Sequence, residues 1–146
     1  MEYLKMDESH VGAIAELEKM CFNDPWSIHS ISSELNNPLS TWLVAVVDGV
    51  VCGYVGSQSV LDGADMMNIA VHPDYRMQGI GYNLVDKLID LLKAKDVISL
   101  SLEVRVSNEN AINLYNKMGF EIIGKRPGYY RNPREDAYIM RKEFAK

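Results

Sequence analysis

The fold is decided by residues 66–92, MMNIAVHPDYRMQGIGYNLVDKLIDLL, which lead from a strand through a glycine turn into a helix. The apolar run at 66–71 predicts the strand, and the helical period of the apolar residues after Gly81 predicts the helix. A second run of strand type follows at 98–106. A strand, a helix and a strand in this order require a parallel pair joined by a right-handed crossover.

The segments on either side extend this unit into a larger sheet. Asp48-Gly49 separates two runs of strand type, which is a strong signal for a two-residue hairpin. We expect strands at 2–6, 41–47, 50–60, 66–71, 98–106, 120–124 and 137–142, with a polar loop at 129–136. We expect helices from Ser9 to about Met20, from Ser27 to before Pro38, after Gly81, and from Ser107 to Gly119, with the three serines as caps. The order β-α-α-β-β-β-α-β-α-β-β predicts an α/β protein with a mixed sheet.

Length and composition favour one cytoplasmic domain over residues 1–146. The chain is 47% hydrophobic and 24% charged, which is ordinary for a globular protein. The start, MEYLKMDESH, lacks the apolar segment of a signal peptide, and no apolar run approaches the ~18 residues of a membrane span. Cys21 and Cys52 are too few for a disulfide framework, so we expect free thiols in a reducing compartment.

Charge is distributed unevenly along the chain. The net charge of −5 argues against a general nucleic-acid binder. Residues 1–103 carry six basic and fifteen acidic side chains, whereas residues 104–146 carry nine basic and five acidic ones. Two interpretations remain open: chance, or a C-terminal part that faces an anion such as a phosphorylated cofactor.

The glycine turn before the predicted helix could bind an anion. Gly79 and Gly81 let backbone N–H groups approach an anion closely, and the helix start adds partial positive charge. Arg76 adds a full charge. The turn is neither a Walker A loop, because no Gly-Lys-Ser/Thr follows, nor a full dinucleotide fingerprint, because the third glycine is missing. A purely structural turn is the alternative.

The same residues resemble a known family. Arg76-x-x-Gly79-x-Gly81 resembles the acetyl-CoA pyrophosphate motif of the Gcn5-related N-acetyltransferases (GNAT), and residues 68–73 and 106–120 are similar to that family too. The resemblance covers nearly the whole chain. The segments 25–27, 102–105, 129–130 and 135–137 resemble the members that acetylate the N-terminal alanine of a bacterial ribosomal protein.

The resemblance implies acetyl-CoA as cosubstrate and no metal. The strands at 66–72 and 98–106 would splay apart as the family's central parallel pair, and main-chain groups of Ile69, Ala70 and Val71 would bind the pantetheine arm as an added strand. A backbone N–H near Val71 would stabilise the oxyanion. The diphosphate would lie on Arg76 and on the amides of Met77, Gln78, Gly79, Ile80, Gly81 and Tyr82, with Asn108 as a further cofactor contact. Met77 and Tyr82 stand where relatives often have a basic residue.

Two residues match the family's catalytic groups. Glu103 would be the general base and Tyr115 the general acid of a direct transfer without a covalent enzyme intermediate. From the residues alone, a surface or salt-bridged strand position is favoured for Glu103, and a tyrosine packed in the core is favoured for Tyr115. A non-catalytic acyl-CoA-binding module therefore stays an alternative.

The resemblance also implies where the acceptor lies and what it is. The loop 21–27, with Trp26, would form one wall of the acceptor site, and Tyr129 and Tyr130 would form the opposite wall. Trp26 could cover a peptide or simply anchor its loop. The implied partner is a protein N-terminus, the alanine of ribosomal protein S18, with no direct nucleic acid and no membrane. A small amine or a lysine ε-amine is the alternative acceptor.

Overall fold

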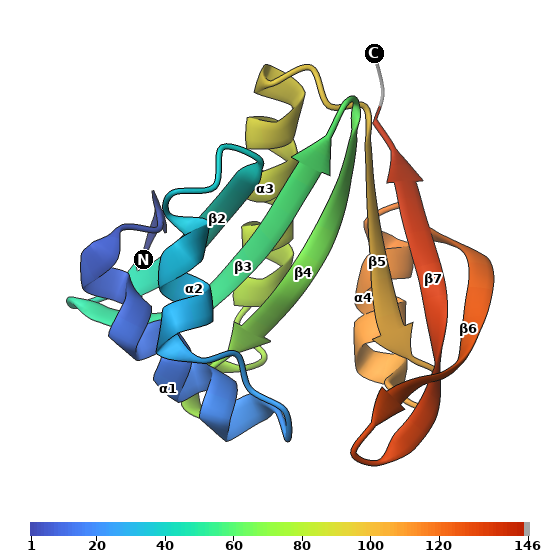
Figure 1. The fold of residues 1–146 in the computed structure, drawn as a ribbon, viewed down its shortest axis with the longest axis horizontal. Helices are drawn as coiled ribbons and strands as arrows, with labels where there is room; N and C mark the ends of the chain where they lie inside the picture. Colours follow the sequence, from blue (N-terminus) through green and yellow to red (C-terminus); the bar gives the residue numbers. More distant parts are fainter. Residues whose placement is uncertain (145–146) are drawn as a thin grey trace.

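A computed structural model describes residues 1–144 as one seven-stranded mixed sheet covered by helices on both faces (Figure 1). The strand order in space is β1-β2-β3-β4-β5-β7-β6. The elements are β1 (Glu2–Lys5), α1 (Val11–Cys21), α2 (Ile28–Glu34), β2 (Ser40–Val47), β3 (Val50–Val60), β4 (Gly63–Val71), α3 (Ile80–Ala94), β5 (Ser99–Arg105), α4 (Glu109–Lys117), β6 (Glu121–Arg131) and β7 (Arg134–Glu143), with short 3₁₀ turns at Glu8–His10 and Pro73–Tyr75. This order confirms the predicted fold class; residues 145–146 of the predicted domain lie outside the described part.

The sheet is opened between its two parallel strands. β4 and β5 pair only from Gly63 to Asp65, against Ser99 to Ser101, and all other neighbouring strands are antiparallel. Beyond these rungs β4 stays with β3 and β5 stays with β7, so the two strands diverge (Figure 1). We call the segments Met66–Val71 of β4 and Leu102–Arg105 of β5 the strand opening.

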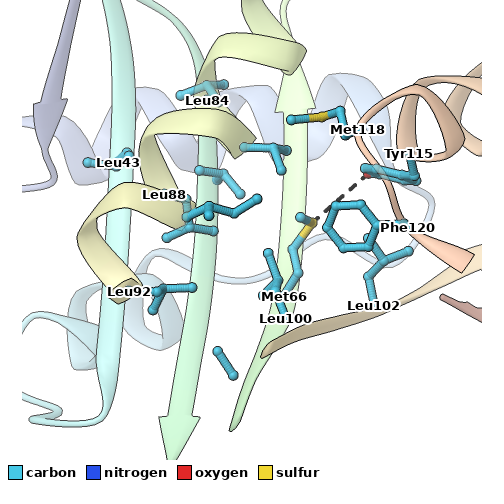
Figure 2. Packing of buried hydrophobic residues seen from close by; sticks show 14 of the residues in the cluster. Leu43, Met66, Leu84, Leu88, Leu92, Leu100, Leu102, Tyr115, Met118 and Phe120 are labelled. Carbon is cyan, nitrogen blue, oxygen red and sulfur yellow. Dashed lines mark hydrogen bonds between the residues drawn. The ribbon is translucent and has the colours of Figure 1, made fainter. Parts of the chain in front are cut away.

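Two hydrophobic cores hold the sheet, one on each face. α1 and α2 cover one face, where Ile14, Trp42 and Tyr54 are buried together. α3 and α4 cover the other face, where Leu84 and Leu88 belong to the same core as Tyr115. Figure 2 shows the α3 leucines beside β2 to β4, and Tyr115 and Phe120 on the far side of Met66. Side chains of the second core therefore fill the space behind the strand opening.

Two predicted helix caps and one predicted loop were wrong. Asp7, not Ser9, caps the first helical turn, and Asn108, not Ser107, caps α4, because in each case the Asp or Asn side chain accepts the orphan backbone N–H. Ser27 caps α2 as predicted. The stretch 129–136 is not a polar loop: β6 and β7 continue through it, with Tyr130 opposite Glu135. Only Asn132 and Pro133 separate the two strands, so this hairpin is longer than expected.

Candidate active site

The edge of β4 in the strand opening presents main-chain groups that the sheet does not use. The N–H of His72 donates to the carbonyl of Cys52, so these two residues form a hydrogen-bonded pair of the β3–β4 ladder. Along antiparallel strands hydrogen-bonded and non-hydrogen-bonded pairs alternate. The alternation turns the main-chain groups of Ala70 toward Tyr54, and those of Ile69 and Val71 away from β3. The main-chain groups of Ile69 and Val71 thus face the strand opening, where the N–H of Ile69 is accepted by Oδ1 of Asn68 and the carbonyl of Val71 accepts Nε of Arg76. Binding of the pantetheine arm along this edge stays a prediction.

The turn before α3 leaves several backbone amides without helical partners. Gly79 is the N-cap with φ 78°, and the N–H of Asn83 donates to its carbonyl as the first helical bond. The amides of Ile80, Gly81 and Tyr82 therefore have no helical acceptor one turn earlier. Met77 also adopts positive φ, 65°. These amides and the helix dipole make a site for phosphate oxygens chemically sound.

The two side chains predicted to help bind the cofactor have partners within the protein. Nε of Arg76 donates to the carbonyl oxygen of Val71 at 3.1 Å, so this exposed guanidinium lies back against the end of β4. Asn108 uses Oδ1 to accept the N–H of Ala111 at 3.2 Å, which caps α4. Their contacts to a cofactor stay predictions, and for Asn108 the amide nitrogen is the atom left to make them.

Tyr115 lies behind the strand opening, in the core formed with α3. Its ring packs at 5.6 Å from that of Phe120, and its hydroxyl points to the sulfur of Met66 at 4.0 Å, marked by the dashed line in Figure 2. Burial raises the pKa of Tyr115, so the phenol keeps its proton throughout the neutral range. The hydroxyl of Tyr115 thus reaches from α4 to Met66 of β4, and its role as general acid stays a prediction.

Glu103 lies on the opposite face of β5. Leu102 and Val104 point into the core of Tyr115, and strand alternation turns Glu103 to the face of α1 and α2. Its Oε1 lies 3.4 Å from Nε of Arg126 on β6, in a partly exposed ion pair. The structure therefore confirms the salt-bridged strand position of Glu103, and its role as general base stays a prediction. The two candidate catalytic groups approach that opening from opposite faces.

Tyr129 and Tyr130 of β6 both lie near Glu103, whose charge acts on both phenols. Their rings meet edge to face at 5.0 Å, and the guanidinium of Arg105 lies 4.2 Å from the ring of Tyr130. Burial, and then the neighbouring charge of Glu103, raise the pKa of Tyr129. Burial, with Tyr129 beside it, raises the pKa of Tyr130 to about 12. Both phenols therefore remain neutral hydrogen-bonding groups beside the candidate base.

The loop predicted as the other acceptor wall is firmly anchored and reaches the tyrosine wall. The ring of Trp26 packs edge-on against Trp42 at 5.5 Å, which favours the anchoring role over a free peptide-covering one. Nδ2 of Asn132, in the β6–β7 turn, donates to both carboxylate oxygens of Asp24 at 3.1 and 3.2 Å. The loop at 22–27 and the β6–β7 hairpin are therefore joined by hydrogen bonds.

Sequence reasoning missed one residue of this region. Glu18 on α1 is a buried carboxylate, 1% exposed, whereas Met20 of the same helix is 56% exposed. Glu18 accepts hydrogen bonds from the backbone of Trp26, from Asn68 and from Tyr54. No periodicity reveals these partners, because they are far apart in the sequence.

Two features are absent from residues 1–144. No group of three or more His, Cys, Asp or Glu side chains is placed to hold a metal ion. Within the same range, none of the helices is both long and apolar enough to cross a membrane.

A sheet opened between two parallel strands, with the free amides of a helix start beside the opening, is the framework of a thioester-dependent N-acyltransferase. Comparison with known families names the group: the model of the acetyltransferase (GNAT) family matches residues 11–120. The chain belongs to the GNAT family, as the motif at 76–81 predicted.

Relatives in that family are similar over nearly their whole length. A Bacillus subtilis (strain 168) protein, provisionally named a ribosomal protein bS18-alanine N-acetyltransferase, is 44% identical over 128 residues, 87% of this chain and 85% of that one. The ribosomal protein bS18-alanine N-acetyltransferase of Escherichia coli (strain K12) is 36% identical over 137 residues, 92% of each chain. The crystal structure of the Escherichia coli ribosomal-protein-S18-alanine N-acetyltransferase matches with a TM-score of 0.91 at 34% identity, covering 99% of this chain and 94% of that one.

Proposed function

We propose that this protein transfers the acetyl group of acetyl-CoA to the N-terminal α-amine of a protein, with the alanine of ribosomal protein S18 as acceptor. The observation that carries the proposal is the strand opening itself, with a candidate acid behind it and a candidate base in front of it. The similarity to the Escherichia coli enzyme over 92% of both chains supports the choice of acceptor.

The placement of these groups supports direct transfer across the opening. The amine nitrogen attacks the thioester carbonyl carbon; the C–N bond forms and the C–S bond then breaks. The N–H of Val71, turned away from β3, would stabilise the oxyanion. Glu103 would take the proton of the amine, directly or through water, and Tyr115 would give a proton to the departing thiolate. Base and acid on opposite faces of β5 suit an acceptor that enters from one face and a thiol that leaves on the other.

The chemistry of the acceptor favours an N-terminus over a lysine. An α-amine has a pKa near ~8, so about one in ten molecules is neutral at pH 7. A lysine amine, with a pKa near ~10.4, is neutral in only about one molecule in 2,500. Deprotonation by Glu103, which is paired with Arg126, would therefore be less demanding for an α-amine than for a lysine amine.

A peptide comparison tests the proposal. The protein is incubated with acetyl-CoA and a peptide beginning Ala-Arg, and with the same peptide blocked at its α-amine but carrying an internal lysine. Mass spectrometry is expected to find acetylation at the α-amine of the first peptide and little product with the second. Faster turnover of the lysine peptide or of small amines would assign a different acceptor. Tight acetyl-CoA binding without turnover of any amine would show that the protein is a non-catalytic acyl-CoA-binding module.

We also propose that the enzyme works in the cytoplasm on a protein acceptor, without a membrane or direct nucleic-acid contact. The two cysteines are free thiols, as expected in a reducing compartment. The acidic charge of the chain would attract the basic N-terminus of a ribosomal protein rather than RNA.

A further inference from the structure

The buried carboxylate of Glu18 joins three elements that meet at the acceptor side of the opening. Its Oε1 accepts the backbone N–H of Trp26 at 2.7 Å, and its Oε2 accepts Nδ2 of Asn68 at 2.6 Å. Oε2 also accepts the hydroxyl of Tyr54. Glu18 is 1% exposed, and an ionised carboxylate is buried at high cost unless such donors surround it. A residue with this cost, in a core otherwise made of apolar and aromatic side chains, calls for a specific role.

The first consequence of these bonds is a fixed acceptor loop. The Trp26 backbone is held by Glu18, and its ring packs against Trp42, which stacks on Tyr54 at 5.9 Å. Tyr54 returns to Glu18 through its hydroxyl. The carboxylate and the three rings thus form a closed set of contacts that holds residues 22–27 against the sheet.

The second consequence concerns the amides at the edge of β4. A carboxylate only accepts hydrogen bonds, so it requires Asn68 to present Nδ2. That orientation leaves Oδ1 of Asn68 to accept the N–H of Ile69, which it does at 3.2 Å. Ile69 and Val71 are the residues whose amides face the opening, and one of the two amides is therefore already occupied. The N–H of Val71 is left for the ligand.

We propose that Glu18 is a positioning residue for acetyl transfer: it fixes the acceptor loop through Trp26 and, by orienting Asn68 onto Ile69, leaves Val71 as the single oxyanion donor. This inference rests on the proposed function, because it assigns the two contacts to that reaction. It adds a residue that touches neither substrate and links the acceptor wall to the cofactor edge.

The variant Glu18→Gln tests the proposal with little change of shape. The glutamine amide can direct its NH₂ group toward Asn68, and the Asn68 amide then rotates to accept this hydrogen bond with Oδ1. After that rotation Nδ2 of Asn68 faces the N–H of Ile69, so two donors meet and the hydrogen bond to Ile69 is lost. We expect hydrogen exchange at the Trp26 and Ile69 amides, measured by NMR, to become about tenfold faster. The KM for the peptide rises about tenfold, and the KM for acetyl-CoA changes less than about twofold. Glu16→Gln, an exposed glutamate of the same helix paired with Lys19, is the matched control and changes none of these values.

A second variant keeps the test decisive if Glu18→Gln does not fold. Asn68→Ala removes only the second link, so Ile69 is expected to exchange faster while Trp26 stays protected. Unchanged exchange at both amides and an unchanged peptide KM in folded Glu18→Gln would overturn the proposal, as would equal losses for both substrates. The exchange experiment needs no acceptor. If the wild-type protein acetylates no peptide but the exchange pattern appears, the proposed function fails while the Glu18 contacts stand.

Discussion

Replacing Tyr115 with phenylalanine should separate catalysis from stability. The substitution removes one oxygen and keeps the ring that packs on Phe120. Within residues 1–144 the partner of that oxygen is the sulfur of Met66 at 4.0 Å, and a thioether is a weak acceptor. The free energy of unfolding should therefore change by no more than about 1 kcal/mol.

The effect on turnover should be far larger. A positioned general acid contributes about 10²- to 10⁴-fold in rate, which corresponds to roughly 3–5 kcal/mol of transition-state stabilisation. Because burial raises the pKa of Tyr115, the wild-type rate should show no loss of the acid form below about pH 10. The affinity for acetyl-CoA should stay within about threefold, because the ring and its packing are unchanged.

Three measurements on one preparation decide the matter. Coenzyme A release gives turnover, calorimetry gives the affinity for acetyl-CoA, and urea unfolding gives the stability. Tyr3→Phe is the control, because Tyr3 lies on the edge strand β1 and its hydroxyl accepts a hydrogen bond from Asn83. Turnover of Tyr115→Phe within about threefold of wild type would refute the acid role. A loss of turnover matched by a loss of folded protein would equally refute this reasoning.

Three further predictions follow from the backbone and from buried charge. Gly56→Ala should lower the free energy of unfolding in urea by about 3 kcal/mol, because a Cβ would lie 2.2 Å from the Trp42 ring; Gly12→Ala, with nothing within 4 Å, should instead stabilise by up to about 1 kcal/mol. Gly79→Ala should weaken acetyl-CoA binding about fivefold by calorimetry, because φ 78° strains any other residue by about 1 kcal/mol. Unchanged affinity would contradict a role of this turn in binding the cofactor. Burial raises the pKa of Glu18, so this carboxyl binds its proton more tightly in the folded state than in the unfolded state. The free energy of unfolding, compared with that of Glu18→Gln, should therefore fall as the pH rises above about 4.3. A difference in unfolding free energy that does not change with pH would contradict the raised pKa.

The sequence was sufficient where local chemistry decides the structure. The Asp48-Gly49 turn forms as predicted, with φ of 49° and 77°, because both positions need positive φ and these residues tolerate it. The helix after Gly81 follows its apolar period, and its leucines are buried on one side. The family motif placed the glycine turn at the helix start for the same reason: its conformational demands are local.

Prediction failed where distant residues decide. Tyr130 and Glu135 are paired in a hairpin, although a proline and several charges nearby favour a loop. Pairing between β6 and β7 overrides that local preference. Glu18 lies on an apolar helix face because Trp26, Tyr54 and Asn68 supply its hydrogen bonds. Neither the hairpin nor the buried carboxylate has a local signature.

The strand opening itself is the feature that the residues alone predict least, and its cause is visible in the sheet. The β3–β4 register shifts after Gly56, where Met67 is inserted as an extra residue of β4. A bulge bends and twists its strand, so β4 beyond this point follows β3 and cannot remain flat against β5. The last parallel rung, Asp65 with Ser101, lies just before the bulge. Deleting Met67 should therefore favour further β4–β5 rungs, closing the edge where Val71 is presented, and such a variant should lose acetyl-CoA binding even while it stays folded.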